Sequence, residues 1–354
     1  MEASHLINTA AGITFKKIPE LRKSINVVYD MKAYRLLYKE IKYSNCHIVH
    51  THGSKSGMLG RLAAHRNKVP CIVHTFHGHV FHSYYNSFIS GCIIRFERWM
   101  ARLTTTVIAI SKQQGKELVD VYKIVPSDKL SIIYLGIGKE QFDEDDVNSS
   151  YTIRERFKLP PEIIAIGMIG RMVAIKNFDL FAEVAERILT SPAGYNVRFF
   201  IVGDGELKEK VQRDLDRRTI KWCNTENYFS EAQVIFTSWL SSVNSILKGL
   251  DIVMLTSRNE GTPLSLIEAQ FCGKPVIATD AGGVSDTFVD NETGFLIEQN
   301  NTTAFVDKLE LLINDQQLRE NMGMKAAAFA AQRFSKSIEV EQLKQLYNNC
   351  KSSN

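Results

Sequence analysis

The alternation of short apolar runs with amphipathic stretches restricts the fold of this chain more than any other feature of its sequence. Short runs that are apolar on both faces are typical of strands in a covered parallel sheet, and the amphipathic stretches have helical periodicity. Strands and helices that alternate along a chain form βαβ units. The sequence therefore predicts an α/β fold built on doubly wound parallel sheets.

The alternation occurs in two series, separated by the segment Asp143–Ser150. This segment is acidic and polar and has neither helical nor strand periodicity, so we expect it to link two domains. We predict a first domain at residues 1–147, a second at 148–335, and a C-terminal helix within 336–354 that packs back toward the first domain. Two such sheets leave a crevice between the carboxyl ends of their strands, where α/β proteins bind ligands.

The expected elements follow from the same pattern. In the first series the strands are His47–Val49, Cys71–Thr75, Val107–Ile110 and Leu130–Tyr134, and the helices are Met58–His65, Ile93–Leu103 and Gln113–Tyr122. In the second series the strands are Ile163–Ile169, Val197–Val202, Val234–Phe236, Ile252–Leu255, Val276–Ile277 and Phe295–Ile297. The helices of that series are Phe178–Leu189, Leu207–Arg217, Pro263–Phe271 and Phe305–Ile313, followed by Ile338–Tyr347.

Composition and cysteine usage predict an ordinary cytoplasmic protein. Of the 354 residues, 44% are hydrophobic and 23% are charged, and no apolar run reaches the roughly 18 residues that a membrane span needs. The six cysteines are widely scattered and form no C-x-x-C pair, which argues against a disulfide framework and against a thiolate zinc site. We interpret them as buried thiols in a reducing cytosol.

The charge of the chain is unevenly divided. Residues 1–146 carry 20 Lys and Arg against 13 Asp and Glu, whereas residues 147–354 carry 23 against 26. A basic first half could attract an anionic acceptor, or hold the protein peripherally on the acidic inner face of a membrane. A chance imbalance on a solvated surface explains the counts equally well. Nucleic acid is not expected, because the basic residues are dispersed and accompany no recognised binding motif.

The segment Thr256–Ala269 reads as a strand end, a turn and the start of a helix. Thr262 can cap that helix, Pro263 suits its first turn, and Gly261 lets the backbone approach a ligand closely. The free N–H groups of such a turn form an anion or hydroxyl site, and carboxylates at Glu260 and Glu268 can accept hydrogen bonds from sugar and ribose hydroxyls. The alternative is a helix cap with one exposed glutamate.

A second candidate segment, Gly170–Asn177, follows the first strand of the second domain. Arg171 offers a planar fork for phosphate oxygens and Lys176 a point charge, and both could reach one diphosphate from a strand-to-helix loop. Without other support, two solvated surface cations would explain them as well.

All nine histidines lie within residues 1–82, and four of them cluster at His74, His77, His79 and His82. A metal site is not expected there. Along an extended strand His74 and His77 point to opposite faces, and no carboxylate or thiolate joins them at ligand spacing. One catalytic histidine with capping or core neighbours fits the cluster better.

The order and spacing of these segments resemble family 4 of the retaining GT-B glycosyltransferases, from about Ile18 to the end of the chain. In the second half the resemblance is carried by Ile169–Lys176, Ile201–Glu206, Asp251–Ser257, Glu260–Ala269, Gly273–Gly283 and Thr293–Ile297. In the first half it is carried by His50–His52, Gly57–Ala64, His74–His79, Glu97–Arg98 and Ile110–Ser111, which resemble the branch associated with bacterial surface polysaccharides.

The resemblance implies two Rossmann-like domains facing across a cleft, and transfer of a sugar from a nucleotide diphosphate sugar to an acceptor hydroxyl with retention. It favours UDP as the carrier, a glycan or lipid-linked acceptor, and no metal or other cofactor. The departing phosphate itself would take the acceptor proton, so the protein would supply positioning and charge stabilisation.

Residue roles follow from the resemblance alone. Arg171 and Lys176 match the pair that neutralises the donor diphosphate, Glu268 the carboxylate that binds the ribose, and His77 the active-site histidine of the first domain. Glu260 matches the carboxylate on the donor sugar, helped by the amides of Gly261, Thr262 and Leu264. The remaining donor-side residues are Gly170, Pro263, and the base-recognition loop with Ser238 and Trp239; the acceptor-side residues are His52, Lys55 and His79.

The chain departs from the pattern of this family in two places. Family members usually begin with a strand and a Gly-rich loop, and neither is visible in residues 1–12. This leaves an alternative, namely a catalytically inactive nucleotide-binding or scaffold protein. Asp286 stands where many relatives carry Glu. Two other enzyme classes fit less well, because Glu260 and Glu268 do not suit a glycosidase, and Gly203–Lys208 lacks the third glycine of a dinucleotide-binding loop.

Overall fold

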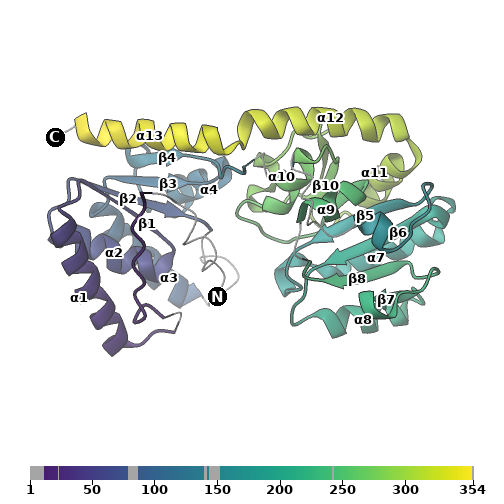
Figure 1. The fold of residues 1–354 in the computed structure, drawn as a ribbon, viewed down its shortest axis with the longest axis horizontal. Coiled ribbons are helices and arrows are strands. Elements are labelled where there is room, and N and C mark those ends of the chain that lie inside the picture. Colours follow the sequence, from purple (N-terminus) through teal and green to yellow (C-terminus); the bar gives the residue numbers. More distant parts are fainter. Residues whose placement is uncertain are drawn as a thin grey trace.

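The computed structural model describes residues 12–22, 24–78, 87–138, 142, 152–240 and 243–352. It contains two parallel sheets, each flanked by helices, and a pair of long C-terminal helices that runs along both halves of the molecule (Figure 1). The predicted α/β class with two parallel-sheet domains is confirmed, and the strand order of the second sheet reverses at β5, as in a doubly wound sheet. The expected linker at Asp143–Ser150 and the residue His79 lie outside the described residues.

The first sheet has four parallel strands in the order β1-β2-β3-β4. Its strands are β1 (Ile48–His52), β2 (Cys71–Phe76), β3 (Thr106–Ala109) and β4 (Leu130–Ile132), and its helices are α1 (Val27–Ser44), α2 (Ser54–Arg66), α3 (Ser87–Arg102) and α4 (Lys112–Lys116). The single helix expected at Gln113–Tyr122 is wrong in part, because α4 gives way to a π-helical turn, η2 (Glu117–Val121). Helix α1 was not predicted, since it buries only Ala33 completely and shows no clear apolar stripe.

The second sheet has seven parallel strands in the order β11-β10-β9-β5-β6-β8-β7. They are β5 (Ile164–Ile169), β6 (Val197–Val202), β7 (Trp222–Asn224), β8 (Val234–Ser238), β9 (Ile252–Leu255), β10 (Val276–Thr279) and β11 (Gly294–Ile297). The chain starts at β5, builds outward through β6, and then returns to the other side of β5 with β9. The loops that follow β5 and β9 therefore leave the sheet side by side, at the switch point where open α/β sheets bind ligands.

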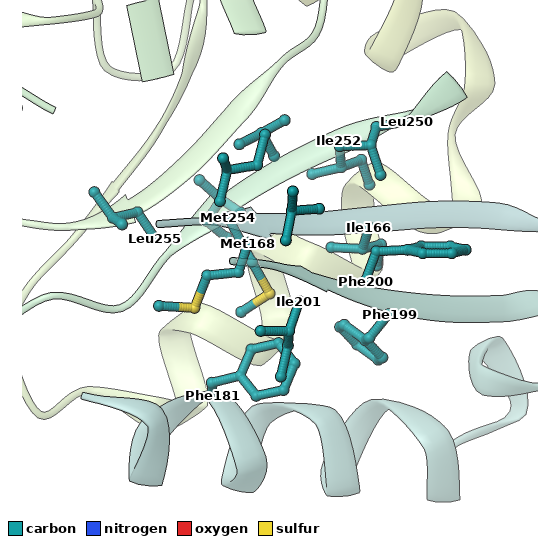
Figure 2. Close-up of a cluster of buried hydrophobic side chains, with 14 of the residues drawn as sticks. Ile166, Met168, Phe181, Phe199, Phe200, Ile201, Leu250, Ile252, Met254 and Leu255 are labelled. Atoms are coloured by element: carbon teal, nitrogen blue, oxygen red, sulfur yellow. The ribbon is translucent and has the colours of Figure 1, made fainter. Parts of the chain in front are cut away.

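The helices of the second half cover both faces of this sheet. They are α6 (Ile153–Arg156), α7 (Phe178–Thr190), α8 (Lys208–Arg217), α9 (Val243–Gly249), α10 (Leu264–Phe271), α11 (Thr302–Asn314) and α12 (Gln316–Arg333), with the short turns η4 (Ala174–Lys176) and η7 (Gly282–Asp286). Phe181 of α7 packs against Phe199 of β6, and Phe200 points from β6 to the other face of the sheet; all three are fully buried (Figure 2). Strands covered on both faces have no polar alternation, which is why the sequence pattern located them well.

The last helix, α13 (Lys336–Ser352), packs on the first sheet (Figure 1). The chain crosses over at residues 334–336, where the amide of Ile137 donates to the carbonyl of Phe334 and the amide of Lys336 donates to the carbonyl of Ile137. On the first sheet Leu346 and Cys350 of α13 join a small core with Val73 of β2. No helix in the described part of the chain is long and apolar enough to span a membrane.

The interpretation of every cysteine as a buried thiol is wrong. Cys71 and Cys350 form a disulfide, with Cα atoms 5.7 Å apart although 279 positions separate them in the chain. Of the other four, only Cys223 is buried, and Cys92 is exposed. The spacing of cysteines along a sequence cannot reveal such a pair, because the return of α13 to β2 is what brings the two within bonding distance.

Candidate functional site

The loop after β5 holds Lys176 over the backbone of Gly170. A Cβ at Gly170 would lie 3.3 Å from the Cε of Lys176, and Gly170 itself has a φ of +151°, which favours glycine. The Lys176 Nζ lies 2.7 Å from the Glu260 Oε1, and the Ser257 hydroxyl donates to the same oxygen. The structure thus joins the predicted cation of one loop to the predicted carboxylate of the other.

Arg171 behaves differently from Lys176. Its side chain is exposed and has no hydrogen-bond or ion-pair partner among the described residues. Arg171 lies in the same loop, directly after Gly170, between the end of β5 and the turn η4. A guanidinium in this state is free to meet an anion without first breaking a protein contact.

The loop after β9 corrects the expected helix start. Pro263 is the N-cap residue of α10 instead of a residue of its first turn, and no side chain in the described part of the chain caps this helix. The Thr262 hydroxyl instead donates across to the first domain, to the carbonyl of Ile110 at 3.3 Å. Among the described side chains, none accepts from the first amides of α10, so these amides can donate to a ligand oxygen.

The turn η7 supports the Glu260–Gly261 loop from behind. The amide of Gly283 donates to the carbonyl of Glu260 at 2.9 Å. A Cβ at Gly283 would lie only 1.8 Å from the carbonyl oxygen of Gly261, and one at Gly282 only 2.3 Å from that of Glu260. The two glycines permit a backbone-to-backbone approach that no other residue would allow.

The two domains meet at this loop. A Cβ at Gly261 would lie 3.3 Å from the carbonyl oxygen of His77, and the amide of Gln113 donates to the Asp286 carboxylate at 3.1 Å. A cavity of ≈ 260 Å³ opens between the domains, lined by Gly78, Ser111, Gln113, Gln114, Glu117, Ile175, Asn259, Glu260, Gly261, Gly282 and Gly283. Crevices of this kind, with convergent polar groups from both domains, are preferred ligand sites.

Sequence reasoning missed several residues that line this cavity, among them Gln113 and Asn259. Neither side chain carries a charge, and no role was assigned to either residue, although Asn259 lies within the candidate segment Thr256–Ala269. Ser111, Gly282 and Gly283 lie in segments that carried the family resemblance, although no role was assigned to them.

Glu268 lies in the middle of α10 and is half-buried. Burial raises the pKa of its carboxyl group to about 7. No ion pair or side-chain hydrogen bond of this carboxyl is found within the described ranges. A carboxyl that is removed from water without a partner is a candidate for ligand binding.

The loop after β8 lies beside Gly170. Ser238 has a φ of +57° and donates to the Asp204 carboxylate at 3.0 Å, and its carbonyl accepts from the amide of Gly203. A Cβ at Gly203 would lie 2.1 Å from the carbonyl oxygen of Gly170 and 3.5 Å from the ring of Trp239. Trp239 itself is 58% exposed, so its ring is accessible to a flat ligand group.

His77 follows the last residue of β2, and its Nε2 lies 2.8 Å from the Nδ1 of His52 at the end of β1. His74 lies on the opposite face, as expected, where its Nδ1 meets the Thr51 hydroxyl at 2.9 Å. Partial loss of solvation lowers the pKa of His77 and His52, although both side chains stay exposed, and full burial lowers the pKa of His74 to about 2. His74 is therefore neutral at pH 7. No group of three or more His, Cys, Asp or Glu within the described ranges has the arrangement of a metal site.

A second cavity, of ≈ 460 Å³, adjoins the first. It lies in the first domain and shares Gly78 with the cavity between the domains. Its walls are largely apolar, with Met58, Phe76, Ile93 and Phe96 among them, and its polar lining residues include His77, Lys55 and Glu97. Lys55 is already engaged, because its Nζ lies 2.5 Å from the Asp30 carboxylate and also donates to two backbone carbonyls.

Family models match both halves of the chain. One described as Glycosyl transferases group 1 matches residues 150–329, and one described as Glycosyltransferase Family 4 matches residues 8–141. The first contains the loops after β5, β8 and β9, and the second contains the histidines of β1 and β2.

Similar proteins of known name come from several bacteria. UDP-Gal:alpha-D-GlcNAc-diphosphoundecaprenol alpha-1,3-galactosyltransferase of Escherichia coli is 32% identical over 93% of this chain and 82% of the relative. Capsular polysaccharide biosynthesis glycosyltransferase CapM of Staphylococcus aureus is 25% identical over 93% and 83%. The crystal structure of Anabaena Alr3699/HepE in complex with UDP and glucose has the same fold, with a TM-score of 0.75 at 18% identity over 92% of this chain and 84% of that chain.

Proposed function

The chain belongs to glycosyltransferase family 4, has the GT-B fold and is of the surface-polysaccharide type, and from this premise we propose that it transfers a sugar from a UDP-sugar to an acceptor hydroxyl with retention. The observation that carries the proposal is the convergence of Lys176 and Glu260 from two separate loops at the switch point of the second sheet. A cation, a carboxylate and uncapped helix amides are the groups that a diphosphate and a sugar require.

Each donor-side residue has a place in this proposal. Arg171 and Lys176 stabilise the charge that develops on the departing diphosphate, and Glu260 with the amides of Gly261 and Leu264 orients the sugar. Glu268 accepts from the ribose hydroxyls, and the exposed Trp239 beside Ser238 meets the base. A bound diphosphate would draw Lys176 away from Glu260, because both anions compete for one ammonium group.

The acceptor enters through the first domain. The apolar cavity beside His77 shares Gly78 with the cavity between the domains, so an acceptor hydroxyl near Gly78 would face the donor sugar. Its apolar walls suit an acceptor sugar joined to a lipid, as in the acceptor named for the Escherichia coli relative. Lys55, paired with Asp30, belongs to the polar lining of this cavity.

Titration of the protein with UDP-glucose and UDP-galactose tests the donor proposal, and a transfer assay on a lipid-linked sugar tests turnover. We expect binding by at least one of the two, with thermal stabilisation of the protein. Binding without transfer to any acceptor would favour the inactive nucleotide-binding alternative. If neither UDP nor either UDP-sugar binds, both the transferase proposal and the inactive nucleotide-binding alternative are contradicted.

The same titration has an expected pH dependence. With a pKa of about 7, the Glu268 carboxyl is mostly protonated at pH 6 and mostly ionised at pH 8. Ribose hydroxyls donate to the ionised form, so affinity should fall about tenfold between pH 8 and pH 6, which is about 1.4 kcal/mol over the whole interval. The ligand does not add a pH dependence of its own in this range, because a UDP-sugar lacks the phosphomonoester group that titrates near pH 6.

Glu268→Gln is the matched variant for this experiment, since its amide oxygen still accepts hydrogen bonds but does not titrate. We expect Glu268→Gln to bind the UDP-sugar with an affinity that changes little between pH 6 and pH 8. The difference between the two pH profiles isolates Glu268 from the histidines, which are common to both proteins. Parallel profiles would remove Glu268 from the ribose site.

Contact with a membrane surface is also part of the proposal. On α3 the large side chains of Phe88, Phe96 and Trp99 are exposed, at 79%, 37% and 45%, beside the exposed Arg95 and Arg102. Aromatic and basic side chains on one helix are typical of surfaces that bind anionic lipid headgroups.

Sedimentation of the protein with phosphatidylserine vesicles should decrease at high salt and in a Phe88→Ser/Trp99→Ser variant. Equal sedimentation with neutral vesicles would argue against an electrostatic contact with the membrane.

A further inference from the structure

Four aromatic side chains form a continuous row on one face of the first sheet. His50 and His52 lie two positions apart on β1 and therefore share a face, and their ring centroids are 4.3 Å apart. His77 continues the row from the end of β2, with its ring 5.0 Å from that of His52. Tyr347 of α13 closes the other end, with its hydroxyl 2.6 Å from the Nδ1 of His50.

The row is fixed at its inner end and accessible at its outer end. Both ring nitrogens of His50 are engaged, one by the Tyr347 hydroxyl and the other by the Thr75 hydroxyl at 2.7 Å. His50 is thereby held in one orientation and gives His52 a fixed ring to pack against. His52 and His77 are exposed, so their 2.8 Å hydrogen bond orients two rings at a surface that a ligand can reach.

We propose that His52 is a positioning residue for His77, which holds the His77 ring through the hydrogen bond between its Nδ1 and the Nε2 of His77. The proposal rests on the proposed function, because it takes His77 to lie beside the donor sugar. The resemblance to the family predicts an acceptor-side role for His52, whereas in the structure its side chain is hydrogen-bonded to His77. With its Nε2 engaged, His77 presents only Nδ1 to a ligand, so His52 also determines which nitrogen is available.

The atoms of the hydrogen bond suggest a matched set of variants. Asparagine at position 52 places an amide group where His52 has Nδ1, and this amide can either donate or accept. Glutamine places its amide where His52 has Nε2, away from His77. Leucine fills a similar space without any polar atom. Positioning by His52 therefore predicts that only asparagine among the three retains the function.

Steady-state transfer kinetics with a UDP-sugar test the proposal. We expect His52→Leu and His52→Gln to lower kcat roughly tenfold with little change in affinity for UDP, and His52→Asn to stay within about threefold of the wild type. Equal kcat in all four proteins would overturn the proposal. Equal loss in Asn, Gln and Leu would overturn it too, because the hydrogen bond would then not be the cause.

A second readout does not depend on turnover. In ¹⁵N spectra of the imidazole groups, assigned with His77→Gln, the wild type should show His77 predominantly as one tautomer. In His52→Leu the Nε2 of His77 has lost its partner, so His77 should show a mixture of tautomers. An unchanged His77 spectrum in His52→Leu would overturn the proposal. A wild type that neither binds nor turns over UDP-sugars would instead contradict the proposed function and leave the spectra to decide whether His52 orients His77.

Discussion

Replacement of Lys176 by alanine is expected to lower kcat for sugar transfer by about 10²–10³, which corresponds to roughly 3–4 kcal/mol of transition-state stabilisation. In the proposed mechanism the ammonium group meets negative charge that grows on the diphosphate as the bond to the sugar breaks. The side chain is held near that point by Gly170 and Glu260 before the ligand arrives, so little reorganisation is needed. Arg171→Ala should lower kcat by a similar factor.

The two variants should differ in stability. Lys176 pairs with a Glu260 side chain that is only 14% exposed, so Lys176→Ala leaves a largely buried carboxylate with the Ser257 hydroxyl as its remaining partner. We expect a loss of about 1–3 kcal/mol in the free energy of unfolding. Arg171 is exposed and has no partner among the described residues, so Arg171→Ala should leave the melting temperature unchanged. Thermal melts beside the kinetics separate the two effects.

Matched controls are available on α8. Lys210 pairs with Asp179 at the surface, and Arg213 is 64% exposed, so neither is near the cavity between the domains. Lys210→Ala and Arg213→Ala remove the same charges and should retain transfer within about twofold, since exposed pairs contribute little. Transfer near the wild-type rate by both Lys176→Ala and Arg171→Ala would exclude a role in catalysis for this pair.

The sequence predicted the strands better than the helices, for a physical reason. Most strands are covered on both faces and read as continuous apolar runs, as at Val197–Val202, and among the described strands only the short β7 was missed. The helices that were not predicted are α1, which is largely solvated, α12, which has no clear apolar stripe, and the short α6 and α9; in addition, α4 changes to a π-helical turn. The C-terminal helix was located, but its bond through Cys350 to Cys71 depends on a crossover that no local pattern encodes.

The candidate site could be predicted where charge and turn chemistry are local. Lys176 and Glu260 were selected from separate loops, and the parallel order of β5 and β9 brings them to 2.7 Å. The helix start at Pro263 was misjudged because the Thr262 hydroxyl has a better acceptor in the other domain, at Ile110. Gln113 was not predicted for the same reason, because its backbone N–H donates to the Asp286 carboxylate across the contact between the two domains.

The second large effect is expected at Gly283, where the backbone of η7 packs directly against the backbone of the Glu260–Gly261 loop. At Gly283 a Cβ would lie 1.8 Å from the Gly261 carbonyl oxygen and 3.1 Å from the Ser111 hydroxyl, and real Cβ atoms essentially never come within 3.0 Å. The blocking atom belongs to a backbone and cannot rotate away. Gly283→Ala must therefore push the Glu260–Gly261 loop out of place by about 1 Å.

A shift of this size should lower kcat/KM roughly 10²-fold, because Glu260 and the Gly261 amide would no longer meet the donor sugar in a productive geometry. The overpacking should also cost about 1–3 kcal/mol of stability. Gly91→Ala is the control, since a Cβ there meets no described atom within 4 Å and alanine is well suited to a helix such as α3. Transfer kinetics, thermal unfolding and UDP titrations on both variants test these two expected losses. Wild-type kcat/KM in Gly283→Ala would mean that the exact position of this loop does not govern transfer, and the donor sugar would then have to be held elsewhere.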